Sequence, residues 1–155
     1  MFLGDLKNGN TPQYFPLALA QYCLSLRIGE GCGIDWDNID LLNRTIRIVR
    51  TIVWDYWTWE PRFSAPKNGK VRILVIPEVL AVELKKLKEV CDPHVKYLDG
   101  VPLVFHKQGI PLSRKTVMCA YNRVLDRLEI KHLRGTHIMR KASATHANEV
   151  TGDIY

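Results

Sequence analysis

The sequence contains no long apolar run, no paired cysteines and no internal repeat. None of its apolar stretches has the length that spans a bilayer, and its first residues carry no secretion signal, so we expect neither a membrane anchor nor export. The four cysteines stand far apart and form no C-x-x-C pair, which excludes the usual zinc and disulfide patterns. We therefore expect a cytoplasmic protein without a metal site.

Acidic residues are scarce in one late segment. Residues 105–141 carry nine Lys and Arg but only Asp126 and Glu129, whereas residues 1–104 carry 13 Lys and Arg against 12 Asp and Glu. Nearly all of the net charge of +6 therefore lies in the late segment. Such a concentration is typical of a surface that binds a polyanion. A basic face that only meets solvent is an equal alternative.

The pattern of apolar residues predicts a mixed α+β fold, mainly helical with a small antiparallel sheet. The length of 155 residues is enough for one domain with a hydrophobic core. Turn-forming residues predict a frayed lead-in over residues 1–13, and the domain follows over residues 14–155. Helices are expected over residues 14–26, 78–91, 114–128 and 133–150. Strands are expected over residues 45–53, 71–76 and 103–105, with a tight Asn-Gly turn at residues 68–69.

Arg27 ends the most apolar segment of the chain. The residues before it, 15–26, are nearly all apolar and predict a buried helix. A guanidinium at the end of such a helix keeps its charge and needs an anion or several acceptors. Glu30, three residues on, is a local candidate. A structural ion pair and a catalytic role are therefore both open for Arg27.

Several short motifs, taken in order, resemble the tyrosine recombinase (phage integrase) family. Residues 26–30, Leu-Arg-Ile-Gly-Glu, resemble its first arginine motif. Residues 66–70, Pro-Lys-Asn-Gly-Lys, resemble the hairpin that carries its catalytic lysine, and residues 133–137, Leu-Arg-Gly-Thr-His, resemble its second arginine motif. The resemblance covers residues 14–155 and depends on the order of the motifs, because no single motif is diagnostic.

The resemblance implies catalytic roles for four residues. Arg27 and Arg134 would bind the scissile phosphate of DNA. Lys67 would act as general acid toward the leaving 5′-oxygen. Lys131 falls at the position where the family usually has a histidine and some members have lysine. In the family, a tyrosine attacks the phosphodiester to give a 3′-phosphotyrosine link, with no metal or other cofactor.

Other residues have weaker assignments. Lys70 is the alternative general acid, His132 is the alternative to the third cation, and Glu30 would support the first arginine. His137 follows the family pattern, although a packed histidine is the favoured interpretation. The residues expected to contact DNA are Arg114, Lys115, Arg123, Arg127, His132 and His137.

The sequence departs from the family at several places. Ser25 stands where the first motif usually has glycine, and the segment over residues 138–150 is longer than usual. The family continues with a Leu-Gly-His motif and then the nucleophilic tyrosine, whereas this chain reaches Tyr155 first. We do not assign the nucleophile to Tyr155. We expect a partial catalytic domain that lacks its nucleophile and is inactive alone.

The sequence therefore allows three functions. The first is the catalytic domain of an integrase that recombines DNA at specific sites, from a mobile element or a chromosome-resolution system, acting on double-stranded DNA at the nucleoid and as a tetramer in the family. The second is a non-catalytic DNA-binding module that keeps the phosphate clamp. The third is an interaction domain whose basic face is incidental. The aromatic residues Trp54, Trp57 and Trp59 can stack on bases or meet a partner protein, but packing on the core is the favoured interpretation.

Overall fold

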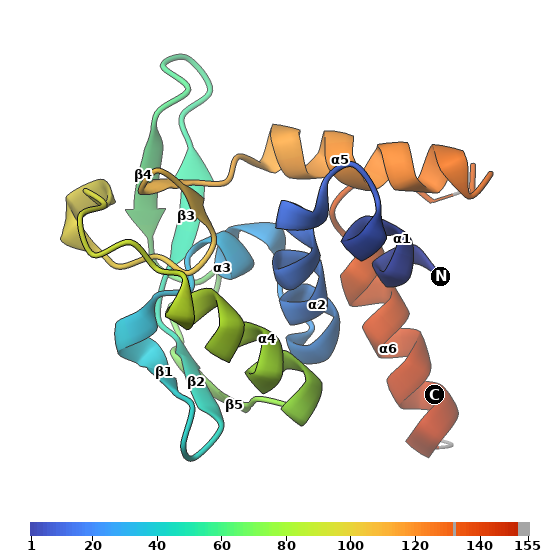
Figure 1. Ribbon diagram of the computed structural model, residues 1–155, viewed down its shortest axis with the longest axis horizontal. Coiled ribbons are helices and arrows are strands. Elements are labelled where there is room, and N and C mark those ends of the chain that lie inside the picture. The colour runs from blue at the N-terminus through green and yellow to red at the C-terminus, as the bar shows by residue number, and fades with distance from the viewer. Residues whose placement is uncertain (132, 152–155) are drawn as a thin grey trace. The chain divides into compact units, whose positions relative to one another are not determined.

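The chain divides into two compact units. The computed structural model describes residues 1–131 and 133–151, with side chains up to residue 146. The first unit joins Met1–Ile28 to the segment that begins at Arg114, and the second unit is Gly29–Ser113. Figure 1 shows both units, coloured along the chain. The first and second arginine motifs, far apart in sequence, thus contribute Arg27 and Arg134 to the same unit.

The first unit is built from helices. Its elements are α1 (Phe2–Asn8), the 3-10 helix η1 (Pro12–Tyr14), α2 (Phe15–Leu24), α5 (Arg114–Arg127) and α6 (Ile138–Thr151). Helices α2 and α6 lie side by side, as do α1 and α5 (Figure 1). Among the residues described, every helix is too short or too polar to cross a membrane.

Helix α1 occupies a segment where the sequence predicts turns. Leu6 is fully buried, and the ring of Phe2 meets the ring of Tyr121 edge-on at 5.5 Å between centroids. The two apolar residues are four positions apart, so they lie on one face of a helix. Burial of this face outweighs the turn preference of Gly4 and Asn8, because packing commonly overrides local propensity.

The end of α2 shows how this chain accommodates serine at a position where the family usually has glycine. Ser25 caps the helix with φ 51° and ψ 39°, the left-handed conformation that glycine adopts without cost. For a residue with a Cβ atom this conformation costs about 1 kcal/mol. The Ser25 hydroxyl lies 2.7 Å from the Ser143 hydroxyl of α6, and this hydrogen bond offsets part of the cost.

The last helix begins later than the sequence predicts. Residues 133–137 form a turn, with Gly135 at φ 81°, and α6 begins at Ile138. Arg134 therefore lies on a loop rather than on a helix. Helix α5 agrees closely with the prediction, and its buried face holds the apolar residues Val117, Ala120, Tyr121, Val124 and Leu125.

The second unit combines short sheets with two helices. Its helical elements are α3 (Ile28–Cys32), which begins at the boundary between the units, η2 (Trp36–Asn38), α4 (Glu78–Glu89) and η3 (Leu98–Gly100). Its strands are β1 (Ile39–Asp40), β2 (Thr45–Ile48), β3 (Thr51–Trp54), β4 (Pro61–Ser64), β5 (Arg72–Val75), β6 (His106–Lys107) and β7 (Ile110–Pro111). They form a three-stranded sheet of order β1-β2-β5 and the antiparallel pairs β3–β4 and β6–β7. The predicted strand over residues 103–105 is reduced to a single bridge between Asp35 and Leu103.

The predicted strand over residues 45–53 is divided in two. Its first half, β2, pairs with β5 from Thr45↔Val75 to Ile48↔Arg72, so the predicted pairing with the return strand is present. Its second half, β3, pairs instead with β4, which the sequence analysis does not predict. The chain thus runs in one direction through β2 and β3 and returns in the opposite direction through β4 and β5. Residues 65–71 form the loop between β4 and β5.

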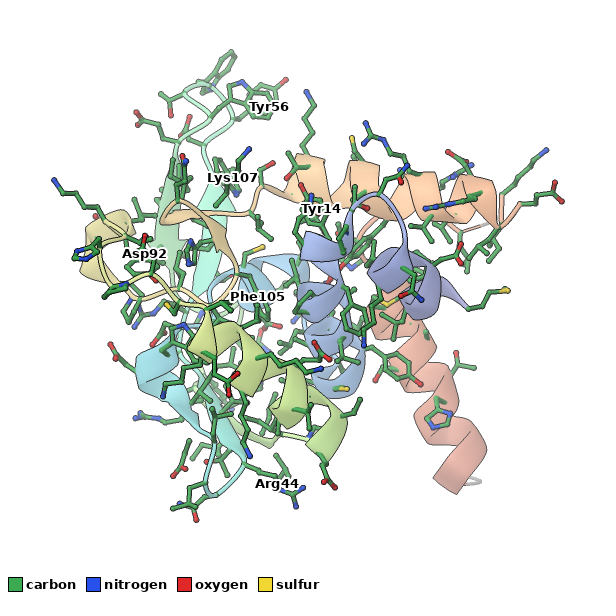
Figure 2. The ribbon with its side chains drawn as sticks, in the orientation of Figure 1. Tyr14, Arg44, Tyr56, Asp92, Phe105 and Lys107 are labelled. Atoms are coloured by element: carbon green, nitrogen blue, oxygen red, sulfur yellow. The ribbon has the colours of Figure 1, made fainter. Side chains whose placement is uncertain are left out.

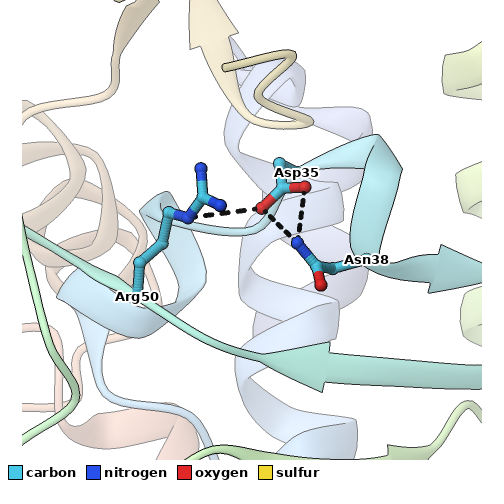
Figure 3. Close-up of polar contacts among 3 residues, drawn as sticks. All are labelled: Asp35, Asn38 and Arg50. Carbon is cyan, nitrogen blue, oxygen red and sulfur yellow. Dashed lines mark hydrogen bonds and ion pairs between the residues drawn. The ribbon is translucent and has the colours of Figure 1, made fainter. Parts of the chain in front are cut away.

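A buried carboxylate lies beside the break between β2 and β3 (Figure 3). Asp35 is 1% exposed, and its carboxylate accepts hydrogen bonds of 2.9 and 3.1 Å from the Asn38 side-chain amide. Arg50, in the link between the strands, places Nε 3.6 Å from the same carboxylate. A buried charge needs such partners. The ion pair stabilises Arg50 at a position outside the pairing of both β2 and β3.

The glycine of the first arginine motif is required by a close approach of two backbones. A Cβ atom at Gly29 would lie 2.7 Å from the carbonyl oxygen of Ile52 and closer still to the hydroxyl of Thr51. Both contacts are shorter than real side chains tolerate. Glycine at this position therefore allows α3 to lie against the start of β3.

Candidate functional site

Arg27 lies directly after the cap of α2. It is half-buried, and the residue before it, Leu26, is fully buried. The Leu26 N–H donates to the carbonyl oxygen of Gln21 at 3.2 Å, and the Ser25 N–H donates to the same oxygen. This pair of bonds is the usual way in which a helix ends on a left-handed residue. It fixes the direction in which the chain leaves α2 toward Arg27.

The Gln21 side chain connects the two arginine motifs. Gln21 is fully buried in α2. Its Nε2 donates to the Leu26 carbonyl at 3.3 Å and to the Thr136 carbonyl at 3.4 Å. Its Oε1 accepts a 2.8 Å hydrogen bond from the Tyr121 hydroxyl of α5. Leu26 precedes Arg27, and Thr136 follows Arg134 by two residues, so backbone from both motifs lies within reach of one nitrogen atom.

Helix α5 holds the loop that carries Arg134. The Gly135 N–H donates to the Asn122 side-chain oxygen at 3.1 Å. Arg134 places Nη1 2.7 Å from Oδ1 of Asp126, and the two side chains are 45% and 62% exposed. Thr136 is buried, and its hydroxyl has no hydrogen-bond partner among the described residues. Arg134 is thus anchored through its backbone while its guanidinium remains accessible to a ligand.

The other predicted cations fall in both units. Lys131 and His137 are exposed beside Arg134 in sequence, while His132 lies outside the described residues. Lys67 and Lys70 are exposed in the second unit, on the loop between β4 and β5. This loop keeps the predicted Asn-Gly turn, in which Gly69 has φ 64° and donates its N–H to the Pro66 carbonyl at 2.7 Å. The flanking strands pair with other strands, so Lys67 lies on a loop and not at the tip of a paired hairpin.

The basic side chains of α5 lie on its exposed surface. Arg114, Lys115 and Arg123 are exposed, and Arg127 places Nε 3.9 Å from the Asp5 carboxylate of α1. Exposed cations on one helix can contact successive phosphates of a nucleic acid.

Glu30 forms an ion pair with an arginine of the three-stranded sheet. It is 4% exposed, and its Oε2 lies 3.0 Å from Nη2 of Arg72 on β5. From the sequence, Glu30 is expected to support Arg27, and the ion pair with Arg72 is not predicted. The ion pair ties α3 to the edge strand of the three-stranded sheet, so Glu30 has a structural role within the second unit.

The aromatic residues of the β3–β4 hairpin reach solvent. Tyr56, Trp57 and Trp59 are 76%, 83% and 60% exposed, and Figure 2 shows Tyr56 at the hairpin tip. The Asp55 carboxylate orders this tip by accepting the N–H groups of Trp57 and Thr58 at 2.8 and 2.9 Å. The favoured expectation of packing on the core is therefore wrong for Trp57 and Trp59.

Metal and thiol chemistry find little support in the described part of the chain. It contains no group of three or more His, Cys, Asp or Glu side chains that could hold a metal ion. Burial raises the pKa of the Cys32 thiol to about 12, so this thiol is protonated at neutral pH and is not a nucleophile.

Gln21 donates hydrogen bonds to backbone carbonyls of both arginine motifs, and the comparison with known families supports the assignment of these motifs. A model of the phage integrase family matches residues 10–154. The chain belongs to the phage integrase family. The sequence resemblance, which starts from Arg27 and Arg134, is thereby confirmed. No curated protein sequence matches the chain.

Solved structures of tyrosine recombinases share the fold of this phage integrase domain. The Tn1549 transposon integrase in complex with circular intermediate DNA aligns with a TM-score of 0.79 at 19% identity, over 96% of this chain and 51% of its own. The XerH site-specific recombinase bound to palindromic difH substrate aligns with a TM-score of 0.65 at 18% identity, over 98% of this chain and 40% of its own. The chain thus spans about half the length of these solved chains or less. The likeness confirms the predicted α+β fold.

Gln21 is the residue of this site that the sequence analysis misses. Its partners in the two motifs are the backbone carbonyls of Leu26 and Thr136, which no side-chain pattern reveals. One signal was available. Gln21 is the only amide or charged residue within the apolar helix Phe15–Leu24. A buried amide requires hydrogen-bond partners, so its presence there indicates contacts with backbone or side chains beyond the helix.

Proposed function

We propose that this chain is the phosphate-binding part of a site-specific DNA recombinase, in which Arg27 and Arg134 bind the scissile phosphate. The observation that carries the proposal is the shared contact of both arginine motifs with the Gln21 amide. Two guanidinium groups on neighbouring loops suit the non-bridging oxygens of a phosphodiester, because each can donate two parallel hydrogen bonds.

The chemistry follows from charge and proton transfer. A tyrosine hydroxyl gives its proton to a base and attacks phosphorus, the bond from phosphorus to the 5′-oxygen breaks, and the tyrosine is left joined to the 3′-phosphate. The arginines offset the negative charge that grows on the non-bridging oxygens. We assign Lys67 as the acid that gives its proton to the leaving 5′-oxygen, with Lys131 as a further cation at the phosphate. The bond energy stays in the phosphotyrosine link, so the strand can be rejoined without a nucleotide.

The family relationship supports this proposal. The two solved relatives are described as complexes with circular intermediate DNA and with a difH substrate. This chain has the same fold, and it carries exposed Arg114, Lys115 and Arg123 on α5 for contacts along the DNA backbone. We propose residues 14–155 as one part of a catalytic domain. A mobile-element role, a site at the nucleoid and assembly on DNA extend the same proposal.

We expect the chain to bind duplex DNA with weak sequence preference and strong salt dependence. Contacts with about four to five phosphates predict a slope of log K against log salt of about −4. Fluorescence anisotropy with a labelled duplex measures this slope. Arg123→Ala on α5 should make it shallower by about one unit, whereas Lys85→Ala, an exposed cation on α4, should leave it unchanged. Absence of binding at low salt would leave only the interaction-domain alternative.

The second candidate is a DNA-binding module without strand cleavage. Tyr121 favours it, because this tyrosine is fully buried and its hydroxyl donates to Gln21. Tyr97 favours it too, because burial, together with the hydrogen bond that its hydroxyl shares with the Cys91 sulfur, raises the pKa of Tyr97 to about 12. Tyr155 lies outside the described residues. We expect no covalent adduct when this chain meets a nicked suicide substrate, as judged by denaturing gel. A phosphotyrosine mapped by mass spectrometry would contradict this expectation and favour the recombinase.

A further inference from the structure

Gln21 makes contacts that a packing residue does not need. Its side chain is fully buried, and the planar amide uses both N–H groups and its oxygen: two donations to carbonyls and one acceptance from Tyr121. A hydrocarbon of similar shape would fill the same space without needing any partner. What the amide adds is a fixed distance between the groups that it bonds.

Those groups belong to the two arginine motifs. The Leu26 carbonyl is part of the peptide bond that leads into Arg27, and the Thr136 carbonyl lies two residues beyond Arg134. Both accept from the same nitrogen, at 3.3 and 3.4 Å. Because the amide is rigid and planar, it sets how far the backbone of one motif lies from the backbone of the other.

One further contact fixes the orientation of the amide, and another holds Leu26 to the Gln21 backbone. The Tyr121 hydroxyl donates to Oε1 at 2.8 Å, which turns Nε2 toward the two carbonyls. The Gln21 backbone carbonyl accepts the Leu26 N–H at 3.2 Å. Leu26 is therefore held to the same residue through both of its peptide groups.

We propose that Gln21 is a positioning residue, whose side chain sets the spacing of Arg27 and Arg134 for one phosphate. Only the binding of one phosphate by the two arginines rests on the proposed function. The bridge between the two motifs through Gln21 is a property of the free protein. Gln21 itself has no contact with DNA in this role and acts through the two arginines. It lies outside the motifs that define the resemblance to the family.

The first experiment tests the bridge without DNA. Gln21→Met keeps the length and volume of the side chain and removes both N–H groups. We expect the carbonyl ¹³C resonances of Leu26 and Thr136 to move together in this variant, because each carbonyl loses a hydrogen bond. The control is Leu17→Met, an equally buried position one turn earlier on α2 that receives the same new residue. It should move neither resonance. Unchanged carbonyl signals in Gln21→Met would overturn the proposal.

The second experiment asks whether the bridge acts through the arginines. We expect Gln21→Met to weaken duplex DNA binding about tenfold, and to change it less than twofold when Arg27 and Arg134 are both alanine. An equal loss in both backgrounds would show a general structural effect and overturn the proposal. If Gln21→Met does not fold, Tyr121→Phe serves instead, with an expected weakening of about threefold and the same dependence on the arginines. Absence of DNA binding by the unchanged chain would refute the proposed function, while the carbonyl resonances would still decide the bridge.

Discussion

Replacing Arg72 with methionine should lower the free energy of unfolding by about 3 kcal/mol. The Glu30 side chain is 5% exposed and lies 3.0 Å from the Arg72 guanidinium. Methionine keeps most of the apolar length of arginine but removes the charge, so the carboxylate remains buried without this counter-ion. The cost is at the lower end of the range for buried pairs, because the Arg72 side chain is 39% exposed. Urea denaturation followed by circular dichroism measures the change.

Two variants show whether the loss belongs to the ion pair. Arg47→Met removes an exposed arginine from the neighbouring strand β2 and should change stability by less than about 0.5 kcal/mol. Glu30→Gln combined with Arg72→Met should cost less than the two single changes added together, because the buried charge is then gone. A loss in Arg72→Met as small as that in Arg47→Met would mean that Glu30 does not depend on this arginine.

The helices could largely be predicted from the sequence, because their apolar spacing is a local property. The predicted helix over residues 114–128 is observed as Arg114–Arg127, and the one over residues 78–91 as Glu78–Glu89. The exceptions have a physical cause. Helix α1 is not predicted, because its segment contains turn-forming residues. Its apolar face is stabilised by Tyr121, more than a hundred residues away. A contact at that distance leaves no local pattern.

Strand pairing was harder to predict than strand content. The β-branched residues over 45–53 identify extended chain, but nothing local shows that its two halves pair with different strands. The break contains Arg50, whose Nε lies 3.6 Å from the carboxylate of the buried Asp35, a residue that is distant in sequence from β4 and β5. The Asn68-Gly69 turn was identified correctly, yet β3–β4 intervenes before it, so the turn lies within a loop between the sheets.

The candidate site also has a part that could be predicted from the sequence and a part that could not. Arg27 and Arg134 could be named from the sequence because each lies in a short recognisable motif. Their connection could not, because it runs through Gln21 to two backbone carbonyls, and a carbonyl is the same in every residue. The residue before Arg27 and the loop around Arg134 are therefore coupled by an interaction that leaves only one trace in the sequence, an isolated amide in an apolar helix.

Replacing Arg27 or Arg134 with alanine should weaken binding to duplex DNA by about 2 kcal/mol, or about 30-fold in Kd. Each guanidinium is proposed to make charge-assisted hydrogen bonds with the same phosphate. The double variant should make the slope of log K against log salt shallower by about one unit, because both guanidinium groups neutralise one phosphate. Anisotropy titrations at several salt concentrations give both quantities. Arg62→Ala, which removes an exposed arginine from β4, is the control and should change Kd less than about threefold. Equal effects of all three arginines would argue against a shared phosphate site.

The ion pair of Arg134 provides a test with the opposite sign. In the free protein the Arg134 guanidinium lies 2.7 Å from Asp126, which occupies donors that a phosphate would need. Asp126→Asn should therefore strengthen DNA binding, by about threefold, since an exposed pair is worth less than about 1 kcal/mol. Part of that gain comes from the lost negative charge alone and will persist in the Arg134→Ala background. The remainder must vanish there, because it arises only by releasing Arg134. A gain of the same size in both backgrounds would mean that Asp126 acts through general electrostatics and that Arg134 is not the phosphate ligand it restrains.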